Sequence, residues 1–62
     1  MAITKEEIIT ALDLGISTAT SNLSLKMASG NIAVEADKIA VVTYLTNIVR
    51  LNNAKTWAEA NL

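Results

Sequence analysis

The sequence predicts an all-α protein, an antiparallel helical hairpin with a possible short third helix at its C-terminus. Apolar residues recur at helical spacing from Ile8 to Met27, and a second apolar pattern follows after residue 31. Between them, Ser29-Gly30-Asn31 is the clearest break in the chain. Because two long helices joined by a short turn are usually antiparallel neighbours, these observations favour a hairpin.

The first predicted helix covers about residues 4–28. The segment from Thr4 to Glu7 fits a capping box, with Thr4 at the N-cap and Glu7 at the N3 position. One face of this helix, within an arc of about 100°, carries Ile8, Leu12, Ile16, Ala19, Leu23 and Met27. Gly15 beside this face is either a site of close packing or a weak point that costs up to about 1 kcal/mol relative to alanine.

The turn at residues 29–31 is expected to lead into a second helix over about residues 32–51. Gly30 suits a left-handed C-terminal cap, and Asn31 suits the N-cap of the helix that follows. The packed face of this helix is expected to consist of Val34, Val41, Leu45 and Ile48, flanked by Tyr44 and Leu51.

The C-terminal segment, residues 53–62, leaves two alternatives. Asn53 either caps a short third helix or lies within a second helix that continues past it. In both cases Trp57 is expected to be an anchor for packing, because its large side chain is costly to leave in water.

A competing fold places a β-hairpin within residues 24–35, between two helices. Leu25 and Met27, and then Ile32 and Val34, alternate with polar or small residues on either side of the turn. The helical hairpin is preferred because the first apolar face continues through Leu23 to Met27 without a change of phase.

The length and composition predict a single small domain, residues 1–62, with a marginal core. A chain of 62 residues without cysteine or histidine has no disulfide and no common structural zinc site to reinforce it. Oligomerisation is the remaining way to stabilise such a chain, so we expect the protein to form an oligomer.

A second set of apolar residues lies away from the predicted packed faces. Charged residues, which normally cover solvent-facing helix surfaces, are almost absent nearby, with only Lys26 between residues 14 and 34 and none between residues 39 and 49. Helices that are apolar on more than one side are usually buried on more than one side. The predicted interaction residues are therefore Ile3, Leu14, Leu25, Ile32, Ile39, Val42, Val49 and Trp57.

The remaining residue types argue against several function classes. Enzymatic activity is not expected, because histidine and cysteine are absent and most carboxylates sit where they suit helix starts. No catalytic residue, cofactor or metal site is predicted. With a net charge of −1 and no basic cluster, nucleic-acid binding is not expected either.

Membrane insertion and export are also not expected. The uncharged run from Ile39 to Val49 is far shorter than the roughly 20 apolar residues of a membrane-spanning helix. The acidic Glu6 and Glu7 come directly before the first apolar pattern, unlike the basic start of a secretory signal. We therefore expect a soluble protein that is cytoplasmic or part of a particle assembled inside the cell.

These observations predict a small, non-enzymatic structural or adaptor subunit that self-assembles through apolar helix faces, as in a coat, filament, virion or helical bundle. Its expected partner is a second copy of itself or another protein. The alternative is a small regulatory binder, either an inhibitor of another protein or a nucleic-acid-binding protein of helix-turn-helix type. The turn at Gly30 is compatible with a helix-turn-helix protein. Recognition helices usually carry several Arg and Lys, however, and Lys38 and Arg50 are the only basic residues expected on the second helix.

Overall fold

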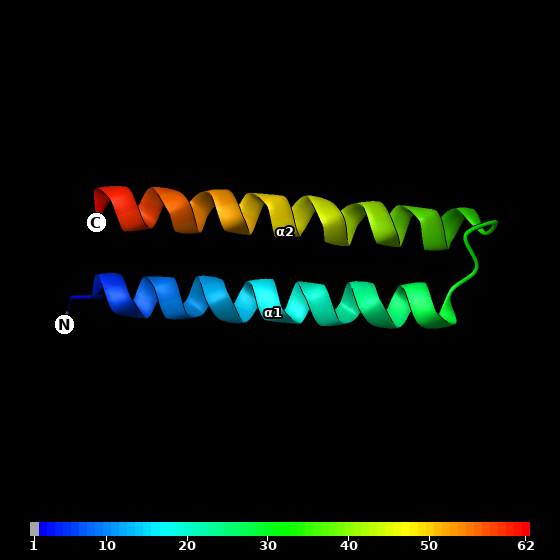
Figure 1. Cartoon of the computed structure of the whole chain (residues 1–62), viewed down its shortest axis with the longest axis horizontal. Coiled ribbons are helices and arrows are strands. Elements are labelled where there is room, and N and C mark those ends of the chain that lie inside the picture. Colours follow the sequence, from blue (N-terminus) through cyan, green and yellow to red (C-terminus); the bar gives the residue numbers. More distant parts are fainter. Residues whose placement is uncertain (1) are drawn as a thin grey trace.

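A computed structural model describes residues 2–62 as two long helices that lie side by side (Figure 1). Helix α1 covers Lys5–Ser29 and helix α2 covers Glu35–Asn61. The helices run antiparallel, so the start of α1 and the end of α2 share one end of a rod of 46 × 16 × 16 Å. The predicted helical hairpin is confirmed, whereas the β-hairpin alternative is wrong, since residues 2–62 contain no strand.

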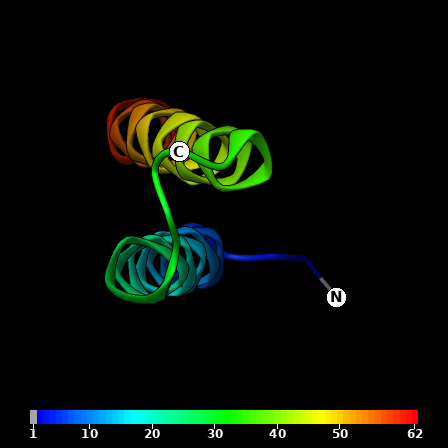
Figure 2. The same cartoon turned by 90° about the vertical axis from the view of Figure 1, so that its right-hand side faces the viewer.

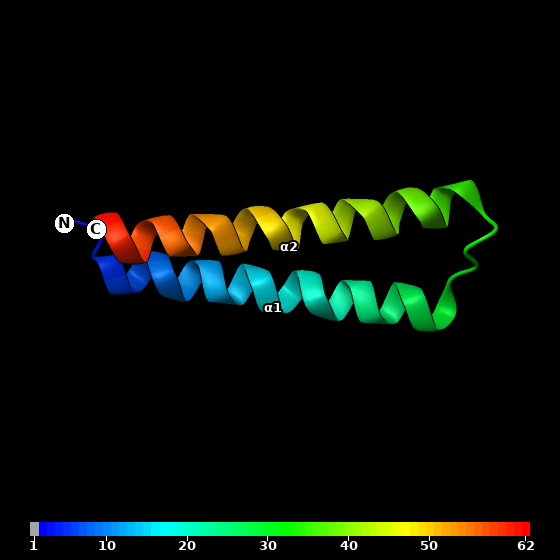
Figure 3. The same cartoon turned by 45° about the horizontal axis from the view of Figure 1, so that its top comes forward.

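The possible third helix is not present within these residues, because α2 continues without a break to Asn61 (Figure 3). The adjacent asparagines Asn52 and Asn53 do not interrupt it. The side chain of Asn52 donates a hydrogen bond to the carbonyl of Ile48, 2.9 Å away, from inside the helix. The alanines that follow are the best helix formers, which favours continuation over a new start.

Helix α1 begins as its sequence predicts. Thr4 has an extended backbone, and its hydroxyl oxygen accepts a hydrogen bond from the amide of Glu7 at 3.2 Å. Glu6 and Glu7 lie in the first turn and Lys26 in the last turn, where their charges complement the helix dipole.

The connection, residues 30–34, differs from the prediction. Gly30 has a φ of −85°, so it is not left-handed; its lack of a side chain matters because a Cβ there would collide with the carbonyl oxygen of Lys26. Asn31 does not cap α2, since its side-chain oxygen accepts from the amide of Ala33 at 2.9 Å in a local turn. The N-cap is Val34, so the second helix starts at Glu35 and not at residue 32.

The two helices pack along one narrow seam, and Figure 2 shows them one beside the other when viewed along the rod. On each helix the residues of the seam are buried or half-buried, and the intervals between them alternate between four and three residues, the spacing of a coiled coil. Among residues 2–62 only Ala19 and Ala58 are fully buried. The seam consists of Lys5, Ile9, Leu12, Ile16, Ala19, Leu23 and Lys26 on α1, and Asp37, Val41, Tyr44, Ile48, Leu51, Lys55 and Ala58 on α2.

Candidate interaction surfaces

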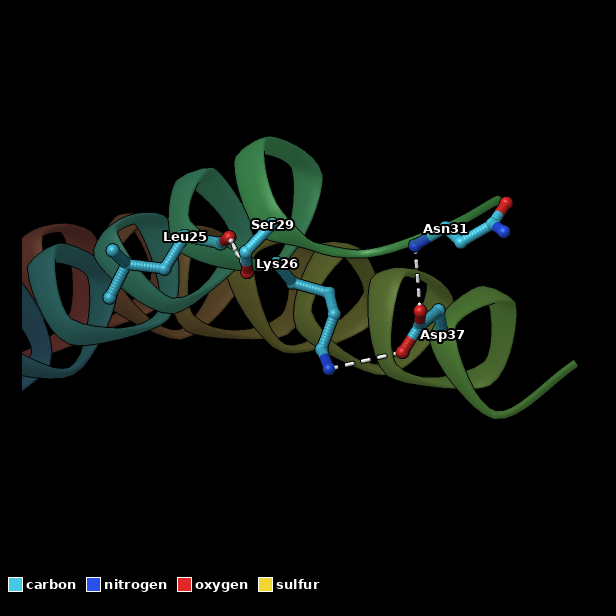
Figure 4. Close-up of polar contacts among 5 residues, drawn as sticks. All are labelled: Leu25, Lys26, Ser29, Asn31 and Asp37. Atoms are coloured by element: carbon cyan, nitrogen blue, oxygen red, sulfur yellow. Dashed lines mark hydrogen bonds and ion pairs between the residues drawn. The ribbon is translucent and has the colours of Figure 1, made fainter. Parts of the chain in front are cut away.

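Charged side chains close the seam at the turn (Figure 4). The ammonium of Lys26 donates to one carboxylate oxygen of Asp37 at 3.1 Å, and the backbone amide of Asn31 donates to the other at 2.7 Å. The Asn31 hydrogen bond, followed by the one from Lys26, lowers the pKa of Asp37 below its ordinary value. Nearby, the hydroxyl of Ser29 donates to the carbonyl of Leu25 at 2.7 Å. The two contacts of Asp37 join α2 to α1 and to the turn, while the Ser29 contact lies within α1.

Two further lysines join the helices at the opposite end. The ammonium of Lys55 lies 2.8 Å from a carboxylate oxygen of Asp13, and this contact raises the pKa of Lys55. The ammonium of Lys5 donates to the backbone carbonyl of Glu59 at 2.9 Å. The ammonium groups of Lys5, Lys26 and Lys55 are therefore engaged in contacts within the hairpin, which leaves them less available to a partner.

All eight residues that were predicted to mediate interactions are exposed in the single chain. Their exposed fractions lie between 58% and 72%. Ile3 precedes α1 and Ile32 belongs to the connection, while Leu14 and Leu25 lie on α1 and the other four lie on α2. The exposure leaves these side chains available for a contact, and their role in one stays a prediction.

The apolar residues on the outer face of α1 are isolated from one another. Leu14 and Leu25 are eleven positions apart, which is about 16 Å along a helix. The exposed residues on the same side between them are small and polar, namely Ser17, Thr18 and Ser21. Scattered leucines of this kind are ordinary on protein surfaces.

The outer face of α2, in contrast, carries apolar residues at closer spacing. Ile39 and Val42 are neighbours at a spacing of three, and Val49 follows one heptad after Val42, with Thr46 between them. Trp57 lies two turns further along the same side. We call Ile39, Val42, Thr46, Val49 and Trp57 the outer α2 face.

Among residues 2–62, four exposed large hydrophobic residues were not predicted as interaction residues: Met27, Val34, Leu45 and Leu62. Three of them, Met27, Val34 and Leu45, were expected on packed faces, but the seam passes beside them. The seam could have been located from intervals that alternate strictly between four and three residues, because this spacing places Asp37 and Lys55 in the seam. A pattern of apolar residues alone does not include these charged positions.

An open groove of about 590 Å³ runs along one flank of the seam. Gly15, Ala19 and Leu51 supply small or apolar surface, and the guanidinium of Arg50 is the charged group among its lining residues. The groove is lined by Leu14, Gly15, Thr18, Ala19, Asn22, Tyr44, Asn47, Arg50 and Leu51.

The structure and the comparisons with known proteins add no assigned site. Residues 2–62 contain no group of three side chains suited to hold a metal ion. Neither α1 nor α2 combines the length and the apolar character that crossing a membrane requires. No family model, curated protein or solved structure matches the chain.

Proposed function

We propose that this chain is a non-enzymatic structural or adaptor subunit that self-associates through the outer faces of its hairpin. The observation that carries the proposal is the excess of exposed surface. A compact monomeric protein of 6.6 kDa is expected to expose about 3,900 Å². The hairpin exposes 4574 Å², and twelve large hydrophobic residues among residues 2–62 are exposed along it.

The size of this excess supports a partner of ordinary dimensions. The hairpin exposes about 700 Å² more than a compact chain of its mass. A standard protein interface removes about 800 Å² from each partner. One such interface would therefore bring the chain to the exposure of a compact protein.

A second copy of the chain is the partner that this geometry favours. Homo-oligomers with closed symmetry are the commonest soluble assemblies. Two antiparallel hairpins of equal length pair readily into a four-helix bundle, in which each hairpin supplies half of the core. Use of a single outer face would give such a closed bundle. Use of both outer faces would give an open filament or coat.

Sedimentation velocity from low-micromolar to near-millimolar concentration, together with far-UV circular dichroism, tests the proposal. We expect the mass to rise to a multiple of 6.6 kDa and the helix content to rise with it, because association stabilises the folded chain. A fully helical monomer at the highest concentration would contradict the proposal.

The second candidate function is a regulatory binder of another protein, and the open groove beside the seam is the observation that favours it. Gly15 and Leu51 would contact an apolar side chain of the partner, and Arg50 would contact an acidic one. A nucleic-acid-binding form has less support, because Lys5, Lys26 and Lys55 are engaged within the hairpin. Capture of one heterologous protein at fixed stoichiometry by a monomeric hairpin, and loss of that capture in Arg50→Ala, would favour this candidate over self-association.

A further inference from the structure

We infer that two copies of the chain pair through the outer α2 face, antiparallel, about a two-fold axis close to Leu45 and Thr46. The inference rests on the proposed self-association and names its interface. It selects one of the two outer faces, a closed dimer and the relative direction of the paired helices.

The choice of α2 follows from a second seam on that helix. Ile39, Val42, Thr46, Val49 and Asn53 recur at intervals of three and four, the spacing of the a and d positions of a coiled coil. No charged residue occurs from Ile39 to Val49. Helix α2 thus carries one heptad seam that packs on α1 and a second that faces away from it, with Ile39, Val42 and Val49 exposed.

The outer face of α1 does not offer an equivalent seam. In one heptad phase the residues around Leu14 are Thr10, Ser17 and Ser21, and in the other they are Ala11, Thr18, Ser21 and Leu25. Neither phase brings two large apolar side chains within one heptad of each other, as Ile39, Val42 and Val49 are on α2. A contact that uses α2 on both chains is isologous, and it closes after two copies. The structure therefore points to a dimer of hairpins with the two α2 helices at its centre.

The antiparallel direction follows from the charge at the start of α2. Glu35 precedes Ile39 by four residues and lies on the same side of the helix. Parallel pairing would bring the two Glu35 carboxylates together, which is unfavourable, and would also align the two helix dipoles. Antiparallel pairing instead places Glu35 near Thr56 of the second copy.

The position of the axis follows from the apolar residues that antiparallel pairing brings together. An axis between Leu45 and Thr46 places Val42 of each chain opposite Val49 of the other. The same axis brings Trp57 to the turn of the second copy, where Ile32 and Val34 are exposed. A large aromatic residue at the edge of an apolar patch is a common anchor of protein interfaces.

Charge insertion distinguishes the two outer faces. We expect Val49→Glu to shift the dimer dissociation constant at least 100-fold, since two carboxylates would be buried against Val42 of the other chain. Leu14→Glu is the matched control on α1, where Leu14 is 68% exposed and Val49 on α2 is 58% exposed, and it should leave the constant within about threefold. Val42→Glu is a second variant on the same face and should act like Val49→Glu. Circular dichroism at high concentration checks that each variant remains helical.

Cross-linking tests the direction, because the natural sequence has no cysteine and each variant carries a single thiol. We expect Thr46→Cys to form a disulfide-linked dimer on oxidation, since position 46 lies beside the axis. Asn53→Cys should not, because antiparallel pairing separates the two copies of position 53 by about 22 Å. A cross-link at position 53 would overturn the antiparallel arrangement.

The outcomes separate the interface from the proposed function. A wild-type chain that stays monomeric contradicts both. A wild-type dimer that Leu14→Glu dissociates and Val49→Glu does not would overturn the α2 interface and leave self-association standing. Wild-type dimerisation that is lost in Val49→Glu and kept in Leu14→Glu supports both, and a concentration-dependent blue shift of Trp57 fluorescence should accompany it.

Discussion

The side chain of Leu51 on α2 lies against the backbone of Gly15 on α1, such that a Cβ at Gly15 would be 3.3 Å from Leu51 Cδ1. The sequence left the role of Gly15 open between close packing and a weak point in the helix. The structure shows a close approach by a side chain and not by the opposite backbone. Leu51 is half-buried and lines the open groove, so it has space on one side into which it can move.

We predict that Gly15→Ala stabilises the hairpin. Alanine in place of glycine inside a helix contributes about 1 kcal/mol, and Leu51 needs to move by only a few tenths of an ångström to accept the new methyl group. The free energy of unfolding, measured by urea denaturation at one fixed protein concentration, should rise by about 0.5–1 kcal/mol. The difference in stability between Ser17→Ala and Ser17→Gly, on the exposed surface of α1, gives the propensity effect alone. A fall in stability for Gly15→Ala would mean that Leu51 cannot move.

The hydrogen bonds of Asp37 predict a loss of stability in acid. Because the Asn31 amide and Lys26 hold the pKa of Asp37 below its ordinary value, folding favours the ionised carboxylate. Its contribution is present above the unfolded-state pKa of about 3.9 and is lost as the pH falls through the folded-state value. Asp37→Asn lacks this dependence on pH. The difference in unfolding free energy between the wild type and Asp37→Asn should therefore shrink as the pH falls from 6 to 2, which thermal melts at a series of pH values would measure.

Glu35→Gln is the control for that titration. Glu35 lies in the same first turn of α2, but its ion pair with Lys38 is a long one of 3.9 Å, and its side chain is 79% exposed. Glu35→Gln should therefore change the free energy of unfolding less than Asp37→Asn does. An equal pH dependence for both variants would indicate a general dipole effect and would contradict a specific role for Asp37.

The contact between Lys55 and Asp13 predicts the opposite behaviour in alkali. The hydrogen bond and charge of Asp13 raise the pKa of Lys55, so folding favours its protonated form. This contribution is complete below the unfolded-state pKa of about 10.4 and is lost as the pH rises through the folded-state value. Asp13→Asn removes the carboxylate that raises the pKa of Lys55. Its deficit in unfolding free energy relative to the wild type, measured by urea denaturation, should disappear at pH values above the titration of Lys55. A deficit that persists in strong alkali would show that Asp13 acts by some means other than Lys55.

Local signals in the sequence were sufficient to predict the hairpin. The Thr4 cap, the apolar repeat from Ile8 to Met27 and the break at Gly30 all act over a few residues. Each has a counterpart in the structure, except that Met27 at the end of the repeat is exposed. The exposure of the candidate interaction residues was predictable in the same way, because exposure follows from helical spacing once the packed side is known. Their role in an interaction stays a prediction.

The details that the sequence did not reveal depend on contacts between distant segments. The start of α2 depends on Asp37, which accepts from the Asn31 amide across the turn, while the Asn31 side chain bonds to Ala33 instead of capping the helix. The exact packed side of α2 depends on Lys55, whose place in the seam follows from Asp13 on the other helix. Neither pairing is visible to periodicity, which counts apolar residues on one segment at a time.

The full burial of Ala58 leads to a last prediction, for the packing of the seam. Ala58 is 1% exposed and lies at the end of the seam where Lys5 and Glu59 meet, so the helices approach closely there. Ala58→Leu should force them apart and lower the free energy of unfolding by about 1–3 kcal/mol, the usual cost of overpacking. Ala54→Leu, one turn earlier and exposed, adds the same atoms without this obstruction and should change stability by less than about 0.5 kcal/mol. Equal effects of the two substitutions in urea denaturation would mean that the helices at this end of the hairpin separate at little cost, and that the seam is held chiefly by its middle residues.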